Sequence, residues 1–393
     1  MIKHNFYLIL CIAGMFMAGC TTKTDVAFID QTDASSITAL DVANKYIVVF
    51  KEKVNLQAAD FPTRNASVKA KAYGLLKKYG ISGDIEEVYE SSINGFAVKM
   101  APGQAKKMEI DSVVKWVEAD KIIALSPIEM EGRPGGGGTS QPPQQTPWGI
   151  TRVGGGVKAT ISGTAWIIDT GIDFAHPDLN VDQTRSRAFL SKPASAADEN
   201  GHGTHVSGIV AAKNNTIGVV GVAPGATLVS VRVLNKSGSG TTSGVIAGVN
   251  YVGANGKDGD VANMSLGGGV STSLDAAVVG ASSVVKFVLA AGNESDDAIN
   301  HSPARVNKAN VYTISAMDKT DTWAYFSNYG SVVDYCAPGV SIYSTYKGSS
   351  YATLSGTSMA TPHVTGLLLL GTIKQDGTVI GDPDGHPDPI AHH

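Results

Sequence analysis

Cysteine is scarce in this chain, with three cysteines among 393 residues. Cys11 and Cys20 fall within the first twenty residues, so the body of the chain contains only Cys336. A disulfide within the body is therefore excluded, and its stability must come from packing or from a bound metal. Cys336 lies in an apolar stretch, which favours a buried small hydrophobic side chain over a reactive thiol.

Charge is also scarce, at 17% of residues, and the net charge is −4. This balance gives no reason to expect a nucleic acid as a partner. Hydrophobic residues make up 43% of the chain, which is enough for a sizeable core, and the length allows two or more domains. Glycine, in contrast, is abundant, with 45 residues, many of them beside the polar positions described below.

The N-terminus has the features of an export signal. A lysine provides positive charge, and residues 6–16 form an apolar run that is too short for an ordinary membrane-spanning helix. The sequence Met17-Ala-Gly-Cys20 resembles a bacterial lipobox, in which the cysteine becomes the lipidated N-terminus. We predict a signal peptide over 1–19, lipidation of Cys20 and a polar tether over 20–44. An ordinary signal peptide that contains a cysteine is the alternative.

Residues 45–125 alternate between strand-like and helical patterns. Strands are expected over 46–50, 85–89, 95–100 and 113–118, and helices over 66–79 and 102–110. The order β-α-β-β-α-β predicts a small ferredoxin-like domain. Residues 126–143 are rich in glycine, proline and glutamine, so they are typical of a flexible linker. It is either a plain connector or a protease-accessible processing region.

The remaining residues, 144–393, predict an open α/β sheet with helices on both sides. Near-continuous apolar runs, typical of strands buried on both faces, cover 165–169, 228–232, 261–265, 286–291 and 311–316. Helical stretches lie between them at 203–212, 244–254 and 273–282. In such folds sites gather at the carboxyl ends of strands, where Asp169, Ser265 and Asn293 occur.

Three short glycine-flanked motifs supply a carboxylate, an imidazole and a hydroxyl, in that order along the chain. They are Asp169-Thr-Gly-Ile-Asp173, Gly201-His-Gly-Thr-His205 and Gly356-Thr-Ser-Met-Ala360. These are the groups that make a serine hydroxyl nucleophilic at neutral pH. We predict that Asp169 orients His202, that His202 acts as the base, and that Ser358 attacks.

Each of these residues also has a simpler interpretation. Asp169 can cap a turn, and Ser358 can be the N-cap of the apolar helix that follows it. His202 and His205 form an H-x-x-H pair, which is compatible with a metal site, although His205 fits better as a buried core histidine. Asn293 follows a strand in Ala290-Ala-Gly-Asn293; we predict that its amide stabilises an oxyanion together with the Ser358 backbone N–H, with a turn asparagine as the alternative.

Taken together, these motifs resemble those of the subtilisin-like serine peptidases, the subtilases, over residues 144–393. The three blocks occur in the family's order, separated by 33 residues from Asp169 to His202 and 156 residues from His202 to Ser358. The resemblance implies a three-layer α/β/α fold with a mostly parallel sheet. It also implies a serine endopeptidase that is made as a zymogen and works through an acyl-enzyme.

The resemblance further implies how a substrate binds. Ser265, Leu266 and Gly267 match the family segment that lines the P1 pocket, and Gly238, Ser239 and Gly240 match the opposing edge. An extended peptide would lie between them as an added strand. Broad specificity for protein or peptide substrates, with a preference for a large apolar P1 residue, follows from this arrangement.

A structural calcium site is also implied by the resemblance, with no organic cofactor. Oxygen ligands from a loop suit calcium, and a plain surface loop is the alternative. The matching positions are Gln144, Asp178 and Asn215 through their side chains and Lys213, Ile217 and Val219 through their carbonyls.

Residues 45–125 then resemble the family's propeptide, an intramolecular inhibitor whose C-terminal end occupies the substrate cleft. The cleavage site is expected within 125–146. The expected protein is an exported monomer, attached to the membrane through lipid on Cys20 at the periplasmic or cell surface. Because that lipid anchors the propeptide, self-cleavage would release the enzyme.

Two other functions are compatible with the sequence. One is a catalytically silent scaffold that keeps the cleft to bind peptides, and the other is a metal-dependent hydrolase that uses His202 and His205. The C-terminal residues 376–388 are rich in turn-forming and acidic residues, and we expect a solvated loop there.

Overall fold

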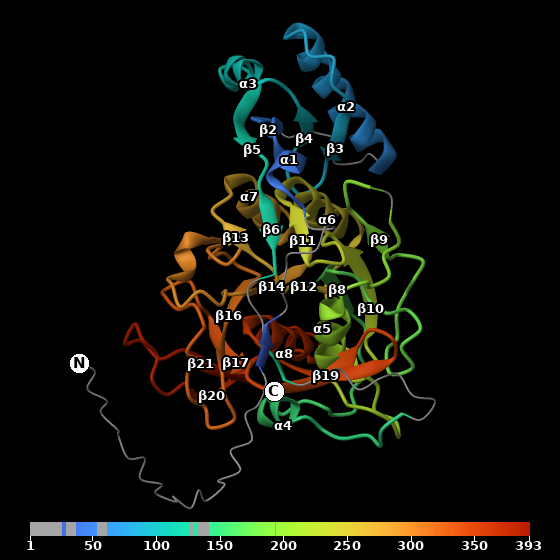
Figure 1. Cartoon of the computed structure of the whole chain (residues 1–393), viewed down its shortest axis with the longest axis vertical. Coiled ribbons are helices and arrows are strands. Elements are labelled where there is room, and N and C mark those ends of the chain that lie inside the picture. Colours follow the sequence, from blue (N-terminus) through green and yellow to red (C-terminus); the bar gives the residue numbers. More distant parts are fainter. Residues whose placement is uncertain (1–25, 29–36, 53–60, 126–128, 132–140, 193) are drawn as a thin grey trace, which may run out of the picture.

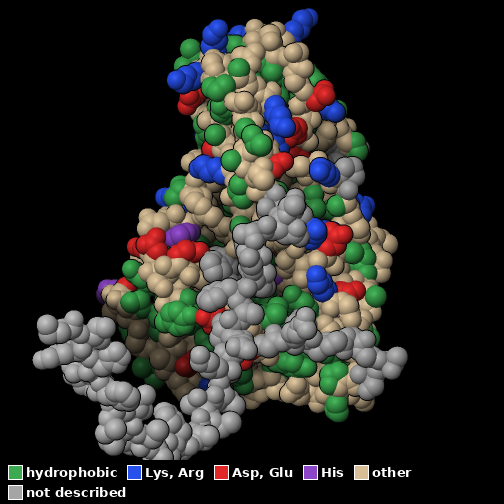
Figure 2. All heavy atoms as spheres, in the orientation of Figure 1, with side chains coloured by type: hydrophobic (Ala, Val, Ile, Leu, Met, Phe, Trp, Pro, Cys, Tyr) green, Lys and Arg blue, Asp and Glu red, His purple; other side chains and the backbone are tan. Residues whose placement is uncertain are grey.

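The computed structural model describes residues 26–28, 37–52, 61–125, 129–131, 141–192 and 194–393. The predicted signal peptide, the lipidation site at Cys20 and most of the linker lie outside these residues. In the described part of the chain, no helix combines the length and the apolar character that crossing a bilayer requires. Figure 1 shows a small upper lobe seated on a larger lower one, and the space-filling view in Figure 2 has the same outline.

The upper lobe has the β-α-β-β-α-β order expected from the sequence. Its elements are β2 (Lys45–Phe50), α2 (Phe61–Lys78), β3 (Ile85–Tyr89), β4 (Gly95–Lys99), α3 (Pro102–Glu109) and β5 (Val114–Ala119). The strands form an antiparallel sheet in the order β3-β4-β2-β5, which is the ferredoxin-like arrangement. Helix α2 begins five residues earlier than predicted, at Phe61.

The lower lobe is built on a nine-stranded sheet, which confirms the predicted α/β class. The strand order is β20-β21-β17-β16-β14-β12-β8-β10-β9, and every pairing is parallel except β20 with β21. The strands are β8 (Thr164–Asp169), β9 (Arg187–Ala188), β10 (Thr227–Arg232), β12 (Val261–Met264), β14 (Lys286–Ala290), β16 (Val311–Met317), β17 (Tyr335–Pro338), β20 (Lys374–Thr378) and β21 (Pro389–His392).

Helices cover both faces of this sheet, as its apolar strands require. The side chains of β8 alternate between two cores: Ala165 and Ile167 pack in one, and Trp166 and Ile168 in the other. Helices α5 and α8 contribute to the first core, and α6 and α7 to the second. The helices of this lobe are α4 (Trp148–Arg152), α5 (His202–Ala211), α6 (Thr242–Asn255), α7 (Thr272–Ala281), the 3-10 helix η1 (Ala298–Asn300) and α8 (Thr357–Leu370).

The C-terminal tail differs from the expected solvated loop. Strand β20 includes its first residues and β21 follows it directly, and β21 extends the large sheet by pairing Ile390 with Cys336. Asp388 is buried and accepts a hydrogen bond from Ser315 Oγ at 2.6 Å. The middle of the segment is mostly exposed, as predicted, but its ends are held by the sheet. Cys336 is fully buried, as expected, and burial raises the pKa of its thiol.

The two lobes meet where the upper sheet packs on α6 and α7 (Figure 1). Asp120 accepts hydrogen bonds from the Ser243 backbone N–H at 2.9 Å and from its hydroxyl at 2.6 Å, in the first turn of α6. Glu118 accepts one from the Ser273 N–H at 2.8 Å, in the first turn of α7. Carboxylates at helix N-termini are stabilised by the unpaired N–H groups there.

Three smaller sheets complete the structure, and one of them contains β7, a strand that lies within the predicted linker 126–143. Strand β6 (Ile122–Ala124) pairs antiparallel with β11 (Ser239–Thr241), and β13 (Gly268–Gly269) pairs with β15 (His301–Ser302). A four-stranded sheet has the order β1-β7-β19-β18, formed by β1 (Val26–Phe28), β7 (Glu129–Glu131), β18 (Ile342–Tyr346) and β19 (Ser350–Ser355). A single-turn helix, α1 (Ala39–Val42), precedes β2.

Candidate active site

Two of the three motif residues stand at the ends of regular elements. Asp169 is the last residue of the buried strand β8, and His202 is the first residue of α5. Gly201, immediately before the helix, has a φ of 119°, which side chains rarely adopt, and a Cβ there would collide with the Tyr346 ring. A glycine is therefore required for α5 to begin at His202.

The Asp169 carboxylate binds the His202 ring directly. His202 Nδ1 lies 2.8 Å from Asp169 Oδ1 and 3.0 Å from Oδ2, and both side chains are almost completely buried. The Thr170 backbone N–H donates to Asp169 Oδ1 at 2.7 Å, which fixes the carboxylate. Because Nδ1 donates to a carboxylate, the other ring nitrogen, Nε2, is left as the proton acceptor.

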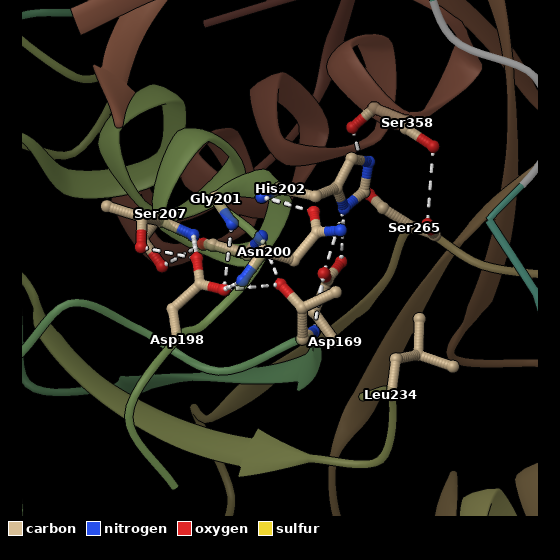
Figure 3. Close-up of polar contacts among 12 residues, drawn as sticks. Asp169, Asp198, Asn200, Gly201, His202, Ser207, Leu234, Ser265 and Ser358 are labelled. Carbon is tan, nitrogen blue, oxygen red and sulfur yellow. Dashed lines mark hydrogen bonds and ion pairs between the residues drawn. The ribbon is translucent and has the colours of Figure 1, made fainter. Parts of the chain in front are cut away.

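Ser358 lies in the first turn of α8, near the His202 ring. Figure 3 shows the ring standing between the Asp169 carboxylate and Ser358. The Ser358 hydroxyl donates to the Ser265 carbonyl at 3.2 Å, and Ser265 Oγ donates back to the Ser358 carbonyl at 2.9 Å. His202 Nε2 is buried and has no hydrogen-bond partner in the described structure. Rotation of the Ser358 hydroxyl toward Nε2 would complete an Asp-His-Ser relay, and such contacts often tighten only when substrate binds.

Asn293 is hydrogen-bonded to the N-terminal end of α8, the helix that contains Ser358. Its Oδ1 accepts hydrogen bonds from the Thr357 N–H at 2.8 Å and from Thr357 Oγ1 at 2.9 Å. With Oδ1 fixed in this way, the orientation of the donor nitrogen Nδ2 is also fixed. The Ser358 backbone N–H belongs to the first turn of α8, where N–H groups favour negative charge.

His205 has a structural role. It is fully buried, and its Nε2 lies 3.0 Å from the Ile342 carbonyl and 3.1 Å from the Ala352 carbonyl, so it bridges β18 and β19. Burial lowers the pKa of His205 to about 3, so the ring is neutral. The structure therefore favours the interpretation of His205 as a buried core histidine over its role as a metal ligand in an H-x-x-H site. Among the described residues, no group of three or more His, Cys, Asp or Glu side chains is placed to hold a metal ion.

The predicted substrate-binding segments lie on either side of β6. Ala124 pairs with Ser239 on one side and forms an antiparallel bridge with Gly267 on the other. The Leu125 N–H donates to the Gly238 carbonyl at 3.0 Å. A strand of this chain therefore lies where the family resemblance implies a substrate strand.

A pocket adjoins Ser358 at this point. Its walls are mostly small or apolar, but they also include Glu294 and His301, which sequence reasoning did not single out. The lining residues are Leu266, Gly267, Gly268, Ala290, Ala291, Gly292, Glu294, His301, Ala304 and Ser358. Glu294 directly follows the predicted oxyanion residue Asn293, and this adjacency is the feature of the sequence that points to it. Its carboxylate accepts a hydrogen bond from Asn328 Nδ2 at 2.7 Å.

Asp198 was also missed, and it organises the loop before His202. It accepts hydrogen bonds from Thr170 Oγ1 at 2.9 Å and from the Asn200 and Gly201 N–H groups at 2.8 and 2.9 Å (Figure 3). Its other oxygen accepts from Thr204. Asp198 thus joins the turn after Asp169 to the helix that carries His202. The feature of the sequence that points to Asp198 is its position four residues before His202.

The predicted calcium residues converge around Asp178. Asn215 Nδ2 donates to Asp178 Oδ1 at 2.8 Å, and the Val219 N–H donates to Oδ2 at 3.1 Å. Gln144 Oε1 accepts from the Asn215 N–H at 2.5 Å, and Asn215 Oδ1 accepts from the Ile217 N–H at 2.8 Å. The residue set fits calcium in its oxygen chemistry. The Asn215 amide would have to turn its oxygen toward Asp178 to act as a ligand.

Comparison with known proteins agrees with this architecture. The family model described as "Subtilase family" matches residues 166–377, and that described as "Peptidase inhibitor I9" matches residues 45–126. A crystal structure titled as a cold adapted subtilisin-like serine proteinase superposes with a TM-score of 0.55 at 39% identity, covering 62% of this chain and 97% of that one.

Curated relatives are similar over most of the chain. The alkaline serine exoprotease A of Vibrio alginolyticus is 41% identical over 84% of this chain, but the match spans only 60% of that relative's own length. The M-protease of Shouchella clausii is 40% identical, covering 74% of this chain and 72% of the relative. The extracellular serine proteinase of a Thermus species is 35% identical, covering 92% and 88%. On these grounds the chain belongs to the subtilase family of serine peptidases, with an inhibitor I9 segment ahead of the peptidase segment.

Proposed function

We propose that this protein is an exported serine endopeptidase, made as a zymogen, that hydrolyses peptide bonds through an acyl-enzyme. The observation that carries the proposal is the buried hydrogen bond between Asp169 and His202, with Ser358 in the first turn of α8 beside that ring. The set supplies a base, a group that orients it, and a nucleophile.

The reaction follows from the positions of these groups. His202 Nε2 takes the proton of Ser358 Oγ as the oxygen bonds to the substrate carbonyl carbon, and Asp169 stabilises the imidazolium that forms. Asn293 and the Ser358 N–H stabilise the oxyanion. The imidazolium then gives its proton to the leaving amine, and the C–N bond breaks. Water, deprotonated by His202, attacks the acyl-enzyme by the same route and releases Ser358.

Broad specificity is proposed for this enzyme. Backbone pairing with β11 and Gly267, which the segment Ile122–Leu125 already makes, tolerates many side chains. The small and apolar walls beside Ser358, which include Leu266, support a preference for an apolar P1 residue. Gly267 on one side of β6 and Gly238 to Gly240 on the other would pair with the substrate backbone. Glu294 and His301 add polar atoms to that pocket.

The upper lobe is proposed to act as an intramolecular inhibitor, in line with its inhibitor I9 match. Its strand β6 fills the position of a substrate strand, and its carboxylates bind the first turns of α6 and α7. Cleavage after β6 would separate inhibitor from enzyme. Anchoring by lipid on Cys20, release after maturation and a monomeric state stay predictions from the sequence.

Calcium is proposed as a structural ion of the loop after α5. Asp178, Asn215 and Gln144 would contribute side-chain oxygens, and Lys213, Ile217 and Val219 their carbonyls. Asp178 is fully buried, and a bound cation would stabilise its charge. The ion would hold the loop to the segment around Gln144 and takes no part in proton transfer.

The direct test compares wild type with Ser358→Ala. Wild type is expected to shorten itself and to cleave casein, and the variant is expected to stay full-length and inactive. N-terminal sequencing of both proteins reports activity and the processing site together. A Ser358→Ala protein that still matures in purified form and still cleaves casein would overturn the proposal. A wild type that stays uncut would instead favour a peptide-binding scaffold.

A further inference from the structure

A second segment of this chain lies along the enzyme beyond β6. Strand β7 pairs antiparallel with β19, with Glu129 opposite Ser355, Met130 opposite Leu354 and Glu131 opposite Thr353. Strand β19 ends at Ser355, three residues before Ser358. The edge that β7 occupies is therefore continuous with the nucleophile's own helix.

Strands β6 and β7 belong to one continuous stretch of chain. Three residues, 126–128, separate Leu125 from Glu129, so the two ends are at most about 15 Å apart at full extension. Leu125 is bound at Gly238, and its neighbour Ala124 bridges Gly267, which lines the pocket that contains Ser358. Strand β6 thus lies along β11 and β7 along β19, the strand that precedes the helix of the nucleophile. Strand β6 therefore occupies the half of the cleft that would bind a substrate N-terminal to the cleaved bond. Strand β7 occupies the half that would bind the leaving group, C-terminal to that bond.

Side chains as well as backbone hold β7. Met130 is half-buried and packs against the core that contains Leu354. The Tyr325 hydroxyl donates to Glu129 Oε1, and the Ser341 hydroxyl donates to Glu131 Oε1. Strand β1 pairs with the other edge of β7. The contacts from β19, Tyr325 and Ser341 come from the lower lobe, whereas β1 lies upstream of the upper lobe in the chain.

The position of β7 in the sequence decides which product keeps it. A cut between Leu125 and Glu129 places β1, the upper lobe and β6 in one product, but Glu129–Glu131 stay covalently joined to the enzyme. Downstream, Pro143 bridges Ile217 and Gln145 bridges Val219, so the chain is anchored again within about a dozen residues of β7. Because β7 and Pro143 both have their partners in the uncut chain, β7 need not move after the cut. A short tether gives a segment an effective concentration of about millimolar.

We propose that β7 is a second, self-supplied inhibitor, which keeps the leaving-group half of the cleft filled after the upper lobe has gone. Full activity then requires a further cut downstream of Glu131. This inference rests on the proposed endopeptidase function. It makes maturation a two-step process, in which the first product accepts small substrates before it accepts proteins.

The test uses the full-length chain, allowed to mature, with its active sites titrated by a fluorophosphonate. One variant carries Glu129→Gly, Met130→Gly and Glu131→Gly, and a matched control carries Arg133→Gly and Pro134→Gly. Each is assayed with an internally quenched peptide that has four residues on both sides of the cut and with a peptide p-nitroanilide that has none on the leaving side. We expect the triple variant to gain about fivefold or more in kcat/KM on the quenched peptide, mainly through KM. The kcat/KM of the triple variant on the nitroanilide should change less than twofold. The control variant should change less than twofold on both substrates.

Two results would overturn the inference. One is an equal kcat/KM on the quenched peptide for the triple variant and for wild type shown by N-terminal sequencing to retain Glu129–Glu131. The other is a first-cut product whose N-terminus already lies beyond Glu131. If the triple variant does not fold, Tyr325→Phe, which removes one contact to Glu129 at an exposed position, must show the same trend. Absence of fluorophosphonate labelling in all proteins would instead refute the endopeptidase function itself.

Discussion

His202 Nδ1 lies 2.8 Å from Asp169 Oδ1, and solvent reaches neither side chain. The carboxylate therefore interacts with the imidazole in a region of low dielectric, where a charge-assisted hydrogen bond is strong. The same carboxylate accepts the Thr170 N–H, so its position does not depend on the histidine.

This arrangement predicts a specific defect for Asp169→Asn. The amide keeps the shape of the side chain but favours the wrong ring tautomer, so kcat should fall by about 10⁴-fold. Active-site-titrated kinetics on a peptide p-nitroanilide measure the loss. Asp258→Asn, which alters an exposed carboxyl, is the matched control and should keep wild-type kinetics. A tenfold or smaller loss in Asp169→Asn would mean that His202 is not oriented in this way.

Asn293→Ala is expected to lower kcat by about 10²–10³-fold with little change in KM, because the amide acts on charge that develops in the transition state. Asn293 also accepts hydrogen bonds from Thr357, so its substitution could displace the start of α8 as well as remove the oxyanion donor. A second variant separates these two effects. Thr357→Ala removes only the hydroxyl contact and should cost less than about tenfold. Equal losses in the two variants would assign Asn293 a structural role only.

The sequence predicted the large elements because their apolar runs are long and their periods clear. Strand β8 and helix α6 begin and end within two residues of the expected bounds, and Cys336 is buried as predicted. Asp169, Ser265 and Asn293 each lie at or just beyond the carboxyl end of a predicted strand, so the sequence also predicted that they lie near one another. Local pattern and tertiary packing agree in these elements.

The missed features depend on contacts between distant segments. Strand β21 is a short run that begins with a proline, and its pairing with β20 and β17 makes it a strand. Strand β7 contains two glutamates, which no pattern marks as a strand until β19 supplies the partner edge. Asp198 acts through backbone N–H groups of a loop, and hydrogen bonds of that kind leave little trace in composition.

The contact between the lobes should weaken as the pH rises. Glu90 is buried against Asn250, whose Nδ2 donates to both carboxylate oxygens at 2.9 and 3.0 Å, and burial raises the Glu90 pKa above its ordinary 4.5. The complex therefore binds a proton that the separated lobe releases, so binding is tightest at low pH and is lost as the pH rises through the raised pKa. Arg64 opposes this shift.

The lag before casein hydrolysis by the self-cleaved protein measures release of the upper lobe. It should shorten in wild type as the pH rises above the ordinary carboxyl pKa, because the raised pKa of Glu90 lies above that value. Glu90→Gln should flatten the dependence, while Glu109→Gln, at an exposed position of α3, should not. A Glu90→Gln protein with an unchanged pH profile would show that another group controls release.

Calcium should stabilise the protein through Asp178. At about 100 times the dissociation constant, a bound ion adds about 2.7 kcal/mol to the free energy of unfolding. For a domain of this size, that corresponds to a rise in Tm of roughly 5–10 °C. Differential scanning calorimetry of Ser358→Ala, which avoids self-digestion, measures the shift with and without calcium. Adding Asp178→Asn should abolish it and adding Asp258→Asn should not; equal shifts in both would place calcium elsewhere.

The central claim is that Ser358 is the nucleophile activated by His202. The most direct measurement is mass spectrometry of the enzyme after reaction with a fluorophosphonate, followed by digestion and mapping of the adduct. The account predicts one phosphonyl group on Ser358, formed in wild type and reduced by orders of magnitude in His202→Ala. An adduct on any other serine, or equal labelling of Ser358 without His202, would contradict it.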